Sequence, residues 1–188
     1  MHDWTWLAPS GLFPGPYICD LSDEPMVHDL APMFQKGYLE SLKQWIPADL
    51  RERVRFLGGV PYSETRDFYA NACVAVFPSV WQEPFGMPVV EAMMSGLPIV
   101  VTKSGGMPEL VVNGETGFVV QRNDSRALGD ALLLLLREPD LRVRMGQAGK
   151  DRARKLYTWE KVAERMLQVY CDLHSDSSTR KAARVPAL

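Results

Sequence analysis

The spacing of four short apolar runs constrains the fold of this chain more than any other feature. The runs occupy residues 54–57, 74–77, 98–102 and 118–120. Runs of this length, rich in valine and isoleucine, predict buried strands, and the segments between them have room for helices. Short apolar strands alternating with helices are typical of a parallel sheet covered on both faces. The pattern therefore predicts an α/β fold with a doubly wound parallel sheet, for which 188 residues and 46% hydrophobic content suffice.

Seven helices are predicted from apolar periodicity and capping residues. One should begin at Pro88 and end at Gly96. Another should run from Trp159 to Leu173 with Thr158 as its cap and one apolar stripe along it. The other predicted helices are 37–45, 64–72 capped by Ser63, 108–112, 126–137 after Ser125, and 140–156 after Pro139. We expect residues 37–173 to form the domain, residues 1–36 to be irregular with one strand at 3–8, and residues 174–188 to be a disordered tail.

Charge and cysteine content exclude several classes of function. The formal net charge of −2 gives no basic surface of the kind that binds nucleic acid. Cys19, Cys73 and Cys171 are odd in number and far apart, which argues against a disulfide framework or a zinc site and favours a reducing compartment. No apolar run reaches the length of a membrane span, and the N-terminus lacks a signal-peptide pattern. We therefore expect a cytoplasmic protein without a transmembrane segment.

Residues 83–91, EPFGMPVVE, carry the strongest functional signal. Pro88 suits the first position of a helix, so Glu83 should lie in the preceding loop and Glu91 in the first helical turn. The backbone N–H groups of Gly86 to Val90 should then point between the two acids and form an anion site. Such a site suits a diphosphate whose attached sugar and ribose hydroxyls need carboxylate acceptors. Taken alone, the two acids also fit an exposed loop residue and a residue that only stabilises the helix dipole.

Six segments in register resemble one enzyme family. The nonapeptide resembles the E-x7-E signature of retaining, family 4 glycosyltransferases with the GT-B fold, specifically their C-terminal donor-binding domain. Between residues 38 and 170, further segments resemble the same family in the same order: RVRFLG at 53–58, FPS at 77–79, SGGMPE at 104–109, NGETG at 113–117 and MGQAG at 145–149. The resemblance implies transfer of a hexose from a nucleoside diphosphate sugar to an acceptor hydroxyl with retention, without a cofactor or bound metal. A lipid acceptor would place the protein at a membrane surface.

The resemblance also implies roles for individual residues. Glu83 would be the catalytic residue, lying beside the transferred sugar and helping to stabilise charge at its anomeric carbon. Glu91 would accept hydrogen bonds from the ribose hydroxyls, and the turn at 59–61 would contact the base. The implied donor-binding residues are Gly59, Val60, Phe85, Gly86, Met87, Pro88, Val89 and Glu91.

Two parts that the family has are not found in this sequence. One is the N-terminal acceptor domain, and the other is the first strand and helix of the donor domain, which carry an arginine and a lysine. Without that strand, segments 3–8 and 54–57 must pair directly with 74–77, or a gap must be filled. We therefore expect a truncated glycosyltransferase whose stripe at 159–173 is exposed or covered by another copy.

Two other functions remain open. The chain fits a non-catalytic remnant or binding module that associates with a complete glycosyltransferase. It also fits a different Rossmann-like enzyme that uses Glu91 on a ribose, although no G-x-G-x-x-G follows a strand.

Overall fold

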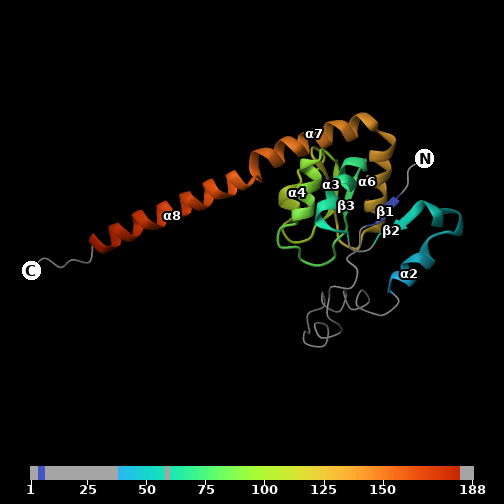
Figure 1. Ribbon diagram of the computed structural model, residues 1–188, viewed down its shortest axis with the longest axis horizontal. Helices are drawn as coiled ribbons and strands as arrows, with labels where there is room; N and C mark the ends of the chain where they lie inside the picture. The colour runs from blue at the N-terminus through green and yellow to red at the C-terminus, as the bar shows by residue number, and fades with distance from the viewer. Residues whose placement is uncertain (1–3, 7–37, 58–59, 183–188) are drawn as a thin grey trace, which may run out of the picture.

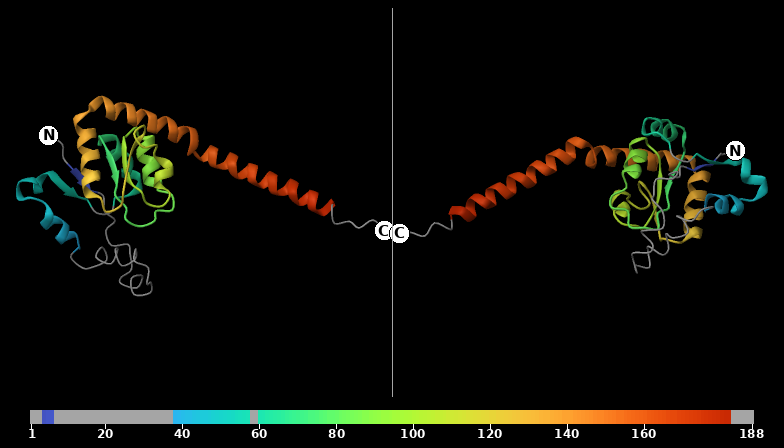
Figure 2. Two further views of the ribbon diagram at one scale, coloured as in Figure 1. Left: turned by 180° about the vertical axis from the view of Figure 1, so that it is seen from behind. Right: turned by 60° about the horizontal axis from the view of Figure 1, so that its bottom comes forward.

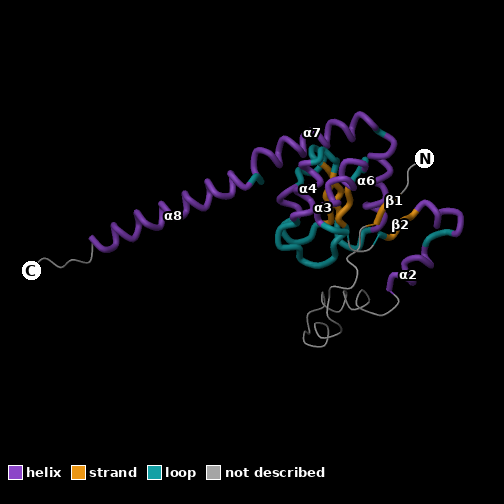
Figure 3. The backbone as a smooth tube through the Cα atoms, in the orientation of Figure 1, coloured by secondary structure: helices purple, strands orange, loops and turns teal. Residues whose placement is uncertain are grey.

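The computed structural model describes residues 4–6, 38–57 and 60–182. Within them the strands form two parallel sheets, drawn in orange in Figure 3. In the first, β1 (Trp4–Trp6) pairs with β2 (Val54–Phe56). In the second, β3 (Ala75–Phe77), β4 (Ile99–Thr102) and β5 (Gly117–Val120) lie in that order. The predicted α/β fold with parallel strands is confirmed, and each strand lies within one residue or two of its predicted range.

The helices between residues 62 and 156 cover the three-stranded sheet on both sides (Figure 1). All the α-helices of the described residues start and end within two residues of the predicted bounds, apart from the end of the last one. Their bounds are α2 Tyr38–Trp45, α3 Tyr62–Asn71, α4 Met87–Met94, α5 Met107–Leu110, α6 Ser125–Arg137, α7 Pro139–Leu156 and α8 Trp159–Ala182. A short 3-10 helix, η3 (Ala48–Arg53), was not anticipated from the sequence.

Strand β4 lies at the centre of the core, and all four of its residues are buried. Successive side chains of a strand point to opposite faces, so Ile99 and Val101 pack with α4, α5 and the end of α7. Val100 packs on the other face with Leu135 of α6 and Met145 of α7. This two-sided burial is why the strand is continuously apolar rather than alternating.

Two helix starts differ from the prediction because the cap is a different residue. Helix α3 begins at Tyr62 after Pro61, without a side-chain cap, so Ser63 lies inside the first turn. Helix α6 begins at Ser125, because the Asp124 carboxylate accepts a hydrogen bond of 2.8 Å from the Ala127 N–H. A carboxylate in that position satisfies one of the helix's unpaired donors.

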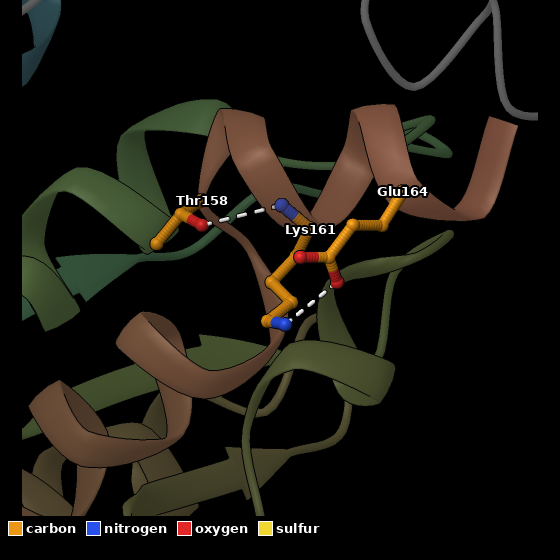
Figure 4. A network of polar contacts seen from close by, with 3 residues as sticks. All are labelled: Thr158, Lys161 and Glu164. Carbon is orange, nitrogen blue, oxygen red and sulfur yellow. Dashed lines mark hydrogen bonds and ion pairs between the residues drawn. The ribbon is translucent and has the colours of Figure 1, made fainter. Parts of the chain in front are cut away.

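Helix α8 projects away from the rest of the molecule, as all views in Figures 1 and 2 show. Its start matches the prediction, since the Thr158 hydroxyl accepts from the Lys161 N–H, and Lys161 forms an ion pair with Glu164 (Figure 4). Hydrogen bonds from its own backbone N–H and from Thr158 hold the pKa of Glu160 below its usual value. The helix continues to Ala182, so the segment predicted to be a disordered tail is helical from 174 to 182.

The sequence left two alternatives, direct pairing of segments 3–8 and 54–57 with 74–77 or a gap that must be filled, and the direct pairing is not found among the described residues. There, β1 pairs only with β2, and β3 pairs only with β4. Among the residues that the structure describes, no strand of one sheet is hydrogen-bonded to a strand of the other. Apart from β1, the segment predicted to be irregular, 1–36, lies outside the described residues.

Candidate functional site

The loop between β3 and α4, residues 78–86, lies at the carboxyl edge of the three-stranded sheet. Ligands bind at this edge in open α/β folds. Five consecutive loop residues, 79–83, each accept one hydrogen bond from elsewhere in the chain. The donors lie at the end of β4, just after β4, or just after β5. The pairs are Ser79 O with Thr102 Oγ1, Val80 O with Arg122 Nη1, Trp81 O with Ser104 Oγ, Gln82 Oε1 with Gly105 N, and Glu83 O with Gly106 N.

Two glycines allow these segments to approach so closely. A Cβ on Gly105 would overlap the Glu83 backbone, lying 2.6 Å from its nitrogen, and a Cβ on Gly106 would lie 2.6 Å from Pro84 O. Gly105 also has a φ of +53°, in the left-handed region that other residues avoid. The half-buried Glu83 therefore has a backbone position set directly by the 104–106 segment.

The start of α4 differs from the anion site predicted for it. Gly86 is the N-cap, with a φ of 95°, and the helix begins at Met87 with Pro88 second. The N–H groups of Val89 and Val90 both donate to Gly86 O, at 2.9 and 3.4 Å, so they are used by the helix itself. Within the described part of the chain, the N–H groups of Gly86 and Met87 donate no hydrogen bond. Two N–H groups there thus have no partner, that of the buried Gly86 and that of the exposed Met87, rather than the whole run from Gly86 to Val90.

Glu91 lies in the second turn of α4 rather than the first, because the helix begins one residue before Pro88. It is half-buried, and Tyr69 of α3 lies close to it. The Tyr69 hydroxyl donates to Pro88 O at 3.4 Å. Burial raises the pKa of Tyr69 from 10.0 to about 12, and the charges of Glu91 and Tyr62 make smaller contributions in the same direction. Tyr69 therefore stays protonated as a hydrogen-bond donor at neutral pH.

The other predicted donor-binding residues occupy varied environments. Met87 and Pro88 are exposed beside the loop, and Val60 is half-buried before α3. Val89 is 1% exposed, and its N–H is bonded to Gly86, so neither group is available to a ligand in this conformation. Gly59 lies outside the described residues.

Phe85 contacts the junction between α7 and α8. Its ring is 41% exposed and meets the ring of Tyr157 edge-on, with centroids 5.9 Å apart. Tyr157 in turn donates to Glu109 O at 3.3 Å, and the Arg152 guanidinium donates to Glu109 O and Leu110 O, each at 2.9 Å.

The residues that hold loop 78–86 were not predicted from the sequence. Thr102 ends β4, Ser104 lies just after β4, and Arg122 lies just after β5. Their positions after predicted strands could have indicated them, because ligands bind at that edge of the sheet. Arg152 lies in α7 and Tyr157 directly follows it, in a segment whose sequence predicts a solvated charged helix face. Nothing in the local pattern indicates that Tyr157 contacts Phe85, 72 positions earlier, or that Arg152 bonds to Glu109 and Leu110.

Other surfaces carry weaker signals. A shallow hollow lies between α2, η3 and β2, away from loop 78–86, and is lined by Lys43, Gln44, Ile46, Arg51, Val54 and Phe56. Among the described residues no cluster of three or more His, Cys, Asp or Glu side chains has the arrangement of a metal site. A search of the same residues found no helix with the length and apolar character needed to cross a membrane.

Comparison with known proteins identifies the class to which this fold and loop belong. The sequence profile of the family described as glycosyl transferases group 1 matches residues 35–152. The match contains loop 78–86, α4 and the segment 102–106, and the chain belongs to this family.

Individual relatives agree. The D-inositol 3-phosphate glycosyltransferase of Corynebacterium diphtheriae is 40% identical over 123 residues, which are 65% of this chain and 28% of that protein. Sucrose-phosphate synthase of Thermosynechococcus elongatus superposes with a TM-score of 0.69 at 29% identity, over 92% of this chain and 38% of that one. HepE of Anabaena, solved with UDP, has a TM-score of 0.70 at 20% identity, over 91% of this chain and 49% of that one. The chain spans about a third of the length of the curated relatives it matches.

Proposed function

We propose that this chain is the donor-binding part of a retaining hexosyltransferase of the family 4 type, which takes its sugar from a nucleoside diphosphate. One observation carries the proposal. The Gly86 and Met87 N–H groups lie at the start of α4, between Glu83 in the loop and Glu91 on the helix. Donors next to acceptors suit a ligand that combines a diphosphate with hydroxyl-bearing sugars.

The proposed roles follow from this arrangement. The Gly86 and Met87 N–H groups, at the positive end of α4, receive the diphosphate. Glu91, which lies close to Tyr69, accepts hydrogen bonds from the ribose hydroxyls, and Glu83 lies next to the transferred hexose. Phe85, Met87 and Pro88 wall the sugar site, and the turn at Val60 meets the base.

Catalysis in this proposal relies on positioning and on stabilising the departing diphosphate. No resident metal takes part, so we expect chelators to leave donor binding unchanged. The acceptor is a compound with a free hydroxyl group, and the wide spacing of the cysteines supports a cytoplasmic setting.

The proposal is tested by titration calorimetry of the folded chain with UDP and with GDP. We expect weak binding of at least one, since only the Gly86 and Met87 N–H groups at the start of α4 are without a partner among the described residues. No heat with either ligand at millimolar concentration contradicts it.

A variant tests the role of Glu91. Glu91→Ala should weaken binding of the nucleoside diphosphate by about 1.5–3 kcal/mol, the value of a hydrogen bond to a charged group, and should weaken pyrophosphate far less because pyrophosphate has no ribose. The matched control is Glu115→Ala, which removes an exposed acid before β5, at the opposite edge of the sheet. Equal losses for both ligands would show that Glu91 does not contact the ribose.

A further inference from the structure

We propose that Tyr157 is a positioning residue for the donor site, holding loop 78–86 and the segment 104–110 in one arrangement. The inference rests on the proposed function, because it assigns these two segments to donor binding. Tyr157 lies at the end of α7, where its own N–H is bonded to Ala153 O. Its backbone is thus fixed independently of the two segments it contacts.

The first contact is with the loop. The Tyr157 and Phe85 rings meet edge-on at 78°, which is a favourable arrangement for two aromatic rings. Phe85 immediately precedes Gly86, whose φ of 95° sets the direction of the chain into α4. A shift of Phe85 would therefore move the Gly86 and Met87 N–H groups, which are the proposed diphosphate donors.

The second contact is with α5. The Tyr157 hydroxyl donates to Glu109 O, and Arg152 reaches the same carbonyl, the Leu110 carbonyl and the Tyr157 hydroxyl. The end of a helix as short as α5 has carbonyls without intrahelical partners, so these bonds satisfy groups that would otherwise be unpaired. The guanidinium also lies over the Tyr157 ring, 5.9 Å from its centroid.

The two contacts together act on Glu83. The N–H groups of Gly105 and Gly106 donate to Gln82 and Glu83, and Tyr157 contacts Phe85 and Glu109. Both loops are thereby tied to the α7–α8 junction by a side chain that need not touch the ligand.

The experiment compares Tyr157→Ala and Tyr157→Phe with the wild-type chain in two measurements. The first is the affinity for UDP or GDP, and the second is amide exchange at Gly105 and Gly106 by NMR. Tyr157→Ala should weaken nucleotide binding about tenfold, the upper range for loss of an aromatic pair, and should speed exchange at both glycines. Tyr157→Phe keeps the ring contact and should restore most of the affinity.

The control is Leu135→Ala, which destabilises the core on the opposite face of the sheet, where Leu135 is fully buried. Equal effects of Leu135→Ala and Tyr157→Ala on affinity and on loop exchange overturn the inference. If Tyr157→Ala does not fold, Phe85→Ala removes the same contact from an exposed side and must give the same acceleration at Gly105 and Gly106. If the wild type binds neither nucleotide, the proposed function fails, while the exchange rates still decide the role of Tyr157.

Discussion

Replacing Gly105 with alanine tests whether the close approach of the two loops sets the site. Alanine at position 105 must keep the left-handed backbone φ of +53°, which lowers stability by about 1 kcal/mol relative to glycine. Its Cβ would lie 2.6 Å from Glu83 N and 2.7 Å from Glu83 C, so the segments must separate. Separation breaks the bonds of Gly105 N to Gln82 and Gly106 N to Glu83, each contributing about 1 kcal/mol. The expected loss is about 3 kcal/mol, or roughly 6–12 °C in Tm for a chain of this size.

Gly114→Ala is the matched control. Gly114 has a φ of +82° and no heavy atom within 4 Å of an added Cβ, so alanine there carries the backbone cost without a collision. It should lower stability by only about 1 kcal/mol. Both variants are measured by urea and thermal denaturation. Equal losses for the two variants would refute the reasoning, because they would show that the contact of Gly105 with Glu83 constrains neither loop.

Two further predictions concern Tyr69 and α8. Because the pKa of Tyr69 is raised from 10.0 to about 12, its stabilisation is fully present below pH 10 and is lost as pH rises through 12. Tyr69→Phe should remove this loss of stability at alkaline pH, which amounts to about 1 kcal/mol. The amount is smaller than the full pKa shift implies because the Tyr69 ring is only half-buried. Urea denaturation that shows the same pH dependence of stability in both proteins would contradict the prediction. On α8, the apolar residues Trp159, Met166 and Leu173 are 77%, 50% and 62% exposed, so we expect the protein to self-associate. Size-exclusion chromatography with light scattering measures the association, which Met166→Glu should weaken. A monomer at high protein concentration would contradict the prediction.

The fold was largely predictable because β4 and its neighbours are encoded locally. Buried strands such as Ile99–Thr102 are continuous apolar runs, and Pro88 and Gly96 mark the two ends of a helix. Strand partners were not predictable, since periodicity says which face of a strand is buried but not which strand lies beside it. The end of α8 was missed because residues 174–182 are polar and lack an apolar stripe.

The site was predictable only in part, and sequence distance explains the division. The local conformation of residues 83–91 could be predicted from those residues alone, because their glycine, prolines and two acids indicate a loop followed by a helix. The residues that fix this loop lie far along the chain, with Thr102 23 positions from Ser79 and Arg122 42 positions from Val80. The anion site was overestimated because the first N–H groups of a helix can also bond to the carbonyl of their own N-cap, as those of Val89 and Val90 do with Gly86.

The separation of the two sheets has a consequence for the order in which the chain folds. Pairing Trp4 with Val54 closes a segment of 50 positions, which for a flexible chain costs about 3.5 kcal/mol from its length alone. Three residue pairs, at about 1 kcal/mol per hydrogen bond, barely offset that cost. Strands β3, β4 and β5 instead pair over 24 and 18 positions, and buried helices reinforce them. Assembly should therefore begin with β3, β4 and β5, and β1 should be the last strand to join and the first to leave.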